Sequence, residues 1–422
     1  PPPMLHHTLT LPCGLRVSNR IVKAAMTEKM AGPDGAPTAR LTRLFTRFAQ
    51  GGAGVLFTGN VAVDGRHLES FGNVTLDTAH SEQPFRAWAG AGSAHDVPMV
   101  MQINHPGRQA MRLVDAQPIA PSAVALPSRR FFAIPRAMTT IDIRHVIQQF
   151  VHAAQLAART GFAGVEIHAA HGYLLNQFLS PNTNQRSDAW GGPLENRARL
   201  LLEIVDRVRL AVPGRFAVGV KLNASDFVKG GLEPSDALRV AGLLKGRGLD
   251  FLEVSGGTFE RAASFGRGLG SSSGGMEGYF IELSRQIKDA VQVPVVLTGG
   301  LRSAKAMNAA ISNGACDLVG LARPLVLDPD LPKALLGDDN ARAREARLRL
   351  PRGPVGPLAE LCWYGEQLER IASGRAPLQA GSATPALVRR LLVDPYRAWR
   401  RSSYLARATA AASTVSNMEK SK

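Results

Sequence analysis

The chain has 422 residues, 45% of them hydrophobic, which is enough for one large α/β barrel or for two ordinary domains. Its formal net charge is +16, but the basic residues are spread out, so we expect an arginine-rich surface rather than a nucleic-acid-binding protein. Three widely spaced cysteines cannot by themselves ligate a four-cysteine iron–sulfur cluster, and they argue against a secreted disulfide scaffold. No apolar run reaches the roughly 18 residues of a membrane span. No signal peptide is evident, which favours a cytoplasmic protein.

Short apolar segments alternate with amphipathic ones along the first 320 residues. We expect strands at 20–25, 52–59, 97–103, 162–167, 216–222, 250–255, 293–298 and 316–320. Helices are predicted at 41–50, 84–94, 139–159, 194–210, 235–247, 281–290 and 303–313. Thr139 and Asp142 form a plausible capping box for the third of these helices. Eight such units predict a (β/α)8 (TIM) barrel, whereas a doubly wound sheet would favour a GxGxxG after the first strand, which is missing.

The segments outside the barrel units are less regular. We expect a rim loop at 105–138, a flexible Gly/Ser-rich segment at 266–275 and a charged helix or linker at 342–352. A helix at 358–373 is predicted to pack on the barrel as a C-terminal helical extension. The predicted units are a barrel (1–340), C-terminal helices (341–380) and a basic tail (381–422). We favour a surface helix with a frayed end for the tail over a membrane-binding amphipathic helix, because Pro395 interrupts its pattern.

Residues that can carry chemistry recur where the predicted strands end. They are Thr27, Gln102, His168, Lys221, Gly299 and Gly320. In a closed barrel these ends converge on one mouth, where barrel enzymes place their active sites. His168 and His171 can polarise a carbonyl group or bind a metal, and Tyr173 can give up a proton. The alternative is that all three side chains are merely part of a well-packed loop.

Two glycine-containing loops follow the seventh and eighth strands. The first contains Gly299 and Gly300, and the second runs from Gly320 to Arg323. Loops at these two positions form the usual phosphate site of a barrel, and an arginine can bind phosphate through two hydrogen bonds. Lys221 at the mouth would also need an anionic neighbour to offset the cost of its burial.

The residues after Tyr173, from Leu174 to Arg197, together with the first-strand segment Asn19–Thr27, closely resemble the old yellow enzyme family of FMN-dependent ene-reductases and NAD(P)H:flavin oxidoreductases. The resemblance implies an FMN-binding barrel, and the net positive charge suits anionic FMN and NAD(P)H. The implied FMN-binding residues are Ala25, Met26, Thr27, Gly59 (or its neighbour Asn60), Gln102, Lys221, Gly299, Gly300, Gly320, Ala322 and Arg323. Ala25 and Ala322 stand where the family usually has proline and glycine.

The resemblance also implies an activity. NADH or NADPH would reduce the flavin, and flavin N5 would then pass a hydride to the β-carbon of an α,β-unsaturated carbonyl compound in a ping-pong cycle. His168 and His171 would bind the carbonyl oxygen, and Tyr173 would protonate the α-carbon. No metal is expected in this role. The alternatives are a catalytically silent FMN-binding barrel and a metal-dependent barrel hydrolase that uses His168 and His171. The cysteine count and the lack of a second nucleotide-binding motif argue against the iron–sulfur dienoyl-CoA reductase branch.

Overall fold

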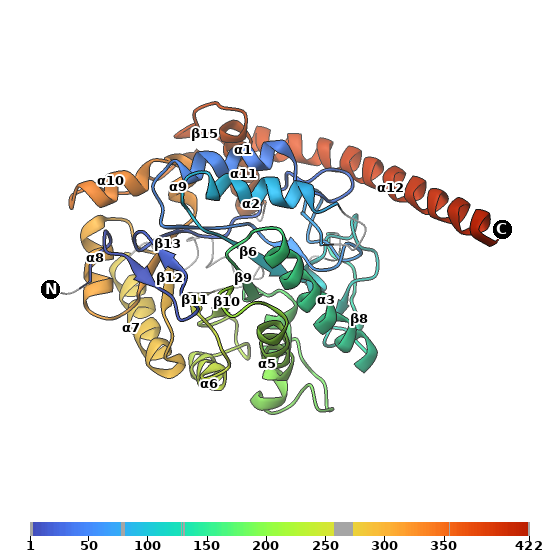
Figure 1. Cartoon of the computed structure of the whole chain (residues 1–422), viewed down its shortest axis with the longest axis horizontal. Coiled ribbons are helices and arrows are strands. Elements are labelled where there is room, and N and C mark those ends of the chain that lie inside the picture. Colours follow the sequence, from blue (N-terminus) through green and yellow to red (C-terminus); the bar gives the residue numbers. More distant parts are fainter. Residues whose placement is uncertain are drawn as a thin grey trace.

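A computed structural model describes residues 3–76, 81–127, 129, 131–256, 273–353 and 355–420. Its centre is a ring of parallel strands surrounded by helices (Figure 1). The strands are β3 (Ile21–Lys23), β4 (Val55–Phe57), β6 (Met99–Asn104), β9 (Gly164–Ala169), β10 (Ala217–Asn223), β11 (Phe251–Ser255), β12 (Val295–Thr298) and β13 (Leu318–Leu321). They pair in chain order, and the pairing of β13 with β3 closes the ring. The prediction of a TIM barrel, with all eight strands, is confirmed.

The helices that cover the ring are α1 (Ala39–Ala49), α2 (Gln83–Ser93), α3 (Thr140–Arg159), α5 (Leu194–Ala211), α6 (Pro234–Leu244), α7 (Ser273–Val291) and α8 (Ala304–Ser312). They begin and end close to their predicted limits, except that α6 ends early and α7 begins at Ser273 rather than at the predicted 281. The capping box is present, since the Thr139 hydroxyl accepts from the Asp142 N–H and the Asp142 carboxylate accepts from the Thr139 N–H. α6 ends three residues before the predicted limit of 247 because the chain turns at Gly246 and Gly248, both with positive φ.

Apolar side chains fill one end of the barrel. The rings of Phe57 and Phe251 lie 5.3 Å apart, centroid to centroid, and the hairpin of β1 (Leu9–Thr10) and β2 (Arg16–Val17) packs against the same cluster. Phe251 needs a glycine on the neighbouring strand, because a Cβ at Gly219 would lie 2.1 Å from its ring. The interior is therefore closed at this end, and polar chemistry is confined to the carboxyl ends of the strands.

Several short elements were not predicted. They are β5 (Val61–Ala62), η1 (Gly107–Gln109), β7 (Ile119–Ala120), β8 (Arg136–Ala137), α4 (Leu174–Leu179), α9 (Arg323–Leu327) and α10 (Leu331–Gly337). The segment predicted as a helix or linker at 342–352 contains a strand instead, β14 (Arg347–Arg349), which pairs with β15 (Ala380–Ser382). The alternation of the strand fits its position, because Leu348 packs on the cluster around Trp363 while the residues on either side of it face solvent. The predicted helix at 358–373 is present as α11 (Gly356–Ala372). The predicted Gly/Ser-rich segment lies outside the described residues as far as 272, and α7 begins at Ser273.

The tail forms one long helix, α12 (Thr384–Lys420), which runs beside α11, continues through Pro395 and then extends away from the barrel (Figure 1). Three of its arginines donate hydrogen bonds to backbone carbonyls of the loops that follow β3 and β5. The pairs are Arg390 with Phe71, Arg397 with Lys29 and Arg401 with Gly65. Part of its basic charge therefore anchors loops at the barrel mouth. Within the described ranges, no helix is long and apolar enough to span a membrane.

Candidate active site

The structure brings His168, His171 and Tyr173 together at the carboxyl end of β9. The ring centroid of His168 lies 5.1 Å from that of His171 and 4.8 Å from that of Tyr173, and both pairs meet edge to face. The sequence spacing alone could not establish this, because His171 and Tyr173 follow the end of the strand. The local backbone has to turn sharply to bring all three rings to the same point.

That turn is held by amide side chains. His171 adopts a left-handed φ of +59°, and its N–H donates to the Asn223 Oδ1 at 3.1 Å. The Gly172 N–H donates to the Asn176 Oδ1 at 2.6 Å, and the Gln177 Nε2 donates to the Gly172 carbonyl at 2.7 Å. Asn176 and Gln177 belong to α4, which starts directly after Tyr173. The helix and the end of β10 therefore fix the rare backbone conformation that positions the rings.

Both histidines are neutral at physiological pH. Burial, followed by the charges of His171 and Lys221, lowers the pKa of His168 well below its ordinary value. Burial and the Lys221 charge lower the pKa of His171 to about 3. The Nδ1 of His168 accepts the Ala170 N–H at 3.2 Å, which leaves the proton on Nε2. A neutral imidazole with a fixed tautomer is a hydrogen-bond donor that suits a carbonyl oxygen.

Tyr173 belongs to a polar network that also contains the predicted flavin residue Thr27. The amide nitrogen of Asn60 lies 3.4 Å from the Tyr173 hydroxyl and 3.2 Å from the Thr27 Oγ1. Burial and the neighbouring Glu69 carboxylate raise the pKa of Tyr173 well above its ordinary value. The phenol therefore keeps its proton at physiological pH, as a proton donor must.

A charged layer of buried side chains lies inside the barrel, beside the histidine pair. The Lys221 Nζ is 2.7 Å from the Glu253 Oε1, and the Gln102 Nε2 donates to the Glu166 Oε2 at 2.7 Å. These four side chains are buried. Lys221 pairs in register with both His168 and Glu253, so the layer lies directly beside the base of the histidine pair.

The two glutamates of this layer have opposite pKa shifts. Burial raises the pKa of Glu166 well above its ordinary value, and the Glu253 charge adds to that shift. Burial also disfavours the charged forms of Glu253 and Lys221, but the surrounding opposite charges and hydrogen bonds together outweigh it: the pKa of Glu253 is lowered and that of Lys221 is raised. Lys221 and Glu253 therefore form a buried ion pair in which each charge compensates the other.

The two glutamates of this layer were not predicted as site residues. The signal was available: Glu166 stands two residues before His168 in an otherwise apolar strand, and Glu253 stands two residues before Ser255. Residues two apart in a strand face the same side. A carboxylate at such a position faces the barrel interior and needs a buried partner.

The predicted phosphate loops are open at the mouth. Gly299 and Gly300 have φ values of +115° and +80° and are exposed, and a Cβ at Gly299 would meet no heavy atom within 4 Å. Arg323 begins α9 close to the Glu360 carboxylate, at 3.5 Å. At Gly320 a side chain is excluded by crowding, since a Cβ there would lie 1.9 Å from the Thr298 Oγ1. Ala322 precedes α9 as its N-cap.

The first-strand residues lie next to the end of the second strand. A Cβ at Gly59 would lie 2.1 Å from the Met26 carbonyl oxygen, so the ends of β3 and β4 are in contact. The Gly59 N–H donates to the Glu28 Oε1 at 2.8 Å, whereas the Asn60 side chain contacts Thr27 and Tyr173. The individual roles of Ala25, Met26 and Gly59 in cofactor binding stay predictions.

Together these groups fit FMN. An open glycine loop with an adjacent arginine suits its phosphate, because glycine lets a ligand approach the backbone closely. A hydroxyl, an amide and a lysine at the ends of three other strands supply hydrogen bonds and positive charge for the polar edge of its ring. They are Thr27, Gln102 and Lys221.

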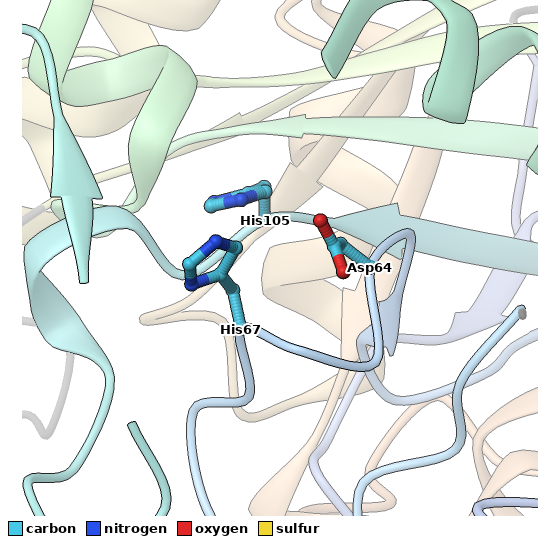
Figure 2. Close-up of side chains that lie close together, drawn as sticks. All are labelled: Asp64, His67 and His105. Carbon is cyan, nitrogen blue, oxygen red and sulfur yellow. The ribbon is translucent and has the colours of Figure 1, made fainter. Parts of the chain in front are cut away.

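A metal site at His168 and His171 would need further ligands beside them. Among the described residues, one group of three potential ligands has its donor atoms within 4.8 Å of one another, and it consists of Asp64, His67 and His105 (Figure 2). Several of its atoms already have partners: Asp64 binds Arg66, the His67 Nδ1 contacts Asp115 and the His105 Nδ1 accepts the Gly107 N–H, whereas the buried His105 Nε2 has no hydrogen-bond partner. The group therefore links the loops after β5 and β6 by hydrogen bonds.

Comparisons with known proteins agree with this geometry. Residues 13–338 match the model of the NADH:flavin oxidoreductase / NADH oxidase family. The chain is 39% identical over 374 residues to the NADH-dependent flavin oxidoreductase iliE of Hypocrea jecorina, covering 82% of this chain and 93% of that protein. It is 38% identical over 405 residues to iccE of Talaromyces variabilis, also an NADH-dependent flavin oxidoreductase, covering 87% and 98%. Among solved structures, morphinone reductase is similar with a TM-score of 0.69 and 28% identity, covering 81% of this chain and 91% of that one.

Proposed function

The chain belongs to the NADH:flavin oxidoreductase / NADH oxidase family, and from this premise we propose that it reduces the C=C bond of α,β-unsaturated carbonyl compounds in a ping-pong cycle. Membership confirms the resemblance to old yellow enzymes, and with it an FMN-dependent enzyme that uses a nicotinamide reductant. The substrate class and the order of the half-reactions are our proposal.

One observation carries the proposal: two neutral imidazoles and a protonated phenol meet at one barrel mouth, with ring centroids about 5 Å apart. Reduction of an enone can use these groups. Negative charge develops on the carbonyl oxygen when the β-carbon accepts a hydride, and two N–H donors stabilise it. The α-carbon then needs one proton, which the phenol supplies.

When bound, FMN supplies the redox chemistry by accepting a hydride from NAD(P)H and donating one to the substrate. The protein positions the reactants. Arg323 and the loop at Gly299 and Gly300 would hold the phosphate, and Lys221 would offset negative charge at the ring. His168 and His171 would bind the substrate oxygen, and Tyr173 would hold its proton at the hydroxyl until transfer to the α-carbon.

The experiment separates the two half-reactions. Holoenzyme reduced anaerobically with NADH or NADPH is mixed with 2-cyclohexenone, and flavin absorbance reports both steps. Tyr173→Phe should slow the oxidative half-reaction by roughly 10²–10⁴-fold, the range that general acid catalysis supplies. The reductive half-reaction should stay within about twofold, since it needs no proton from the phenol.

Tyr404→Phe on α12 is the matched control, since Tyr404 is exposed. Equal losses in both half-reactions of Tyr173→Phe would contradict the assigned role. Reduction by NAD(P)H without reoxidation by any enone in the wild-type enzyme would contradict the proposed substrate class.

A further inference from the structure

We propose that Glu69 is the positioning residue that returns a proton to Tyr173 after each turnover, so that protons reach the active site from solvent through Glu69. This inference rests on the proposed function, because it assumes that Tyr173 gives its proton to the substrate. Glu69 lies on the loop that follows β5.

The carboxylate and the phenol are held together by one amide group. The Asn60 Nδ2 donates to the Glu69 Oε2 at 2.7 Å and lies 3.4 Å from the Tyr173 hydroxyl. The orientation of that amide is set from its other end, where the Asn60 Oδ1 accepts from the Asn73 Nδ2 at 2.8 Å. Asn60 and Asn73 are buried. The negative charge of Glu69 also raises the pKa of the Tyr173 phenol.

Glu69 is partly exposed to solvent and also binds the amide that contacts Tyr173. Its residue is only partly buried, so its carboxylate can exchange protons with water. The loop is fixed from outside, because Arg401 and Arg390 of α12 donate to the carbonyls of Gly65 and Phe71, on either side of Glu69. The carboxylate is therefore a fixed group between solvent and the proton donor.

Tyr173 loses one proton in each turnover and must regain it, and Glu69 lies where it can return that proton. The hydride adds to the β-carbon and the Tyr173 proton to the α-carbon, so the C=C bond gains two hydrogens and the enzyme is left with a phenolate. That phenolate then lies beside the Glu69 carboxylate, and two adjacent anions bind a proton far more readily than either alone. One proton from solvent enters at Glu69 and moves to the Tyr173 oxygen, which restores the starting state.

The first test compares a single turnover with continuous turnover in Glu69→Gln holoenzyme. Its first oxidative half-reaction with 2-cyclohexenone should stay within about threefold of wild type, because Tyr173 still carries its proton, whereas the full effect of losing a general acid would be roughly 10²–10⁴-fold. Steady-state turnover should fall at least about tenfold, because the phenolate is no longer reprotonated through a carboxylic acid. Glu69→Asp should recover part of this loss.

The second test needs no turnover. Phenolate absorbance, titrated in the ligand-free protein with Tyr173→Phe as the subtracted reference, should show a lower pKa for Tyr173 in Glu69→Gln than in wild type, since a neighbouring negative charge has gone. Glu282→Gln, an exposed glutamate on α7, should change neither measurement.

Two results would overturn the proton relay while the proposed function stands. The first is unchanged steady-state turnover in Glu69→Gln. The second is a first oxidative half-reaction that is slowed as much as steady-state turnover, which would indicate that Glu69 has a purely structural role. A wild-type enzyme that reduces no enone would overturn the proposed function itself, and the relay with it.

Discussion

Replacing Lys221 with methionine should strongly destabilise the protein. The substitution keeps most of the side-chain volume but leaves the Glu253 carboxylate charged, with 0% of its side chain exposed and without the ammonium group that lies 2.7 Å away. Removing one partner of such a pair typically costs about 3–5 kcal/mol, because the remaining charge is buried without compensation. We expect a loss of this size in the free energy of unfolding, and also weaker binding of reduced FMN.

The assay is denaturant unfolding followed by tryptophan fluorescence, at one fixed FMN concentration for all variants, because bound ligand adds to stability. The double variant Lys221→Met/Glu253→Gln should recover at least about 1.5 kcal/mol of the loss, as expected for two residues in direct contact. Lys333→Met serves as the control, since that lysine is 62% exposed and should change stability by less than about 0.5 kcal/mol. A loss below about 1 kcal/mol for Lys221→Met, or no recovery in the double variant, would refute the account of the charged layer.

Three further predictions follow from other parts of the structure. His105 and His171 have folded-state pKa values of about 3, below the unfolded value of about 6.5, so the unfolded chain binds more protons than the folded chain below pH 6.5. As the pH falls from 6.5 to 3, each residue should therefore lower the free energy of unfolding by about 1.4 kcal/mol per pH unit. If the free energy of unfolding, measured across this range, did not change, the result would contradict the burial of both histidines. Arg323→Ala should weaken FMN binding by roughly tenfold or more through loss of a charged phosphate contact, measured by fluorescence titration, and unchanged affinity would place the phosphate elsewhere. Gly219→Ala should destabilise the protein by about 1–3 kcal/mol, because its new methyl group meets the Phe251 ring at 2.1 Å, and a neutral effect in a thermal melt would show that the ring can move aside.

Features set by local patterns could be predicted from the sequence. The eight strands are short apolar runs, and Thr139 and Asp142 carry a capping box that needs only its own backbone. The polar residues at strand ends could be assigned to one mouth because parallel strands of a closed barrel all point the same way.

Contacts between distant segments were harder to predict. Glu69 lies on a loop whose sequence shows no periodicity, and only the folded barrel brings it next to Asn60 and Tyr173. β14 was not predicted because Arg347–Arg349 form a strand only by pairing with Ala380–Ser382, a segment distant in the sequence. No local sequence pattern predicts such a strand.

We propose that the barrel mouth holds one FMN, which passes a hydride from NAD(P)H to an enone. The most direct measurement is anaerobic titration of the purified holoenzyme with NADH and with NADPH, followed by 2-cyclohexenone and identification of the product. We predict one FMN per chain, bleaching by one equivalent of at least one of the two nucleotides, and full recovery of colour with one equivalent of saturated ketone. Protein that neither contains FMN nor takes it up when it is supplied would contradict the claim.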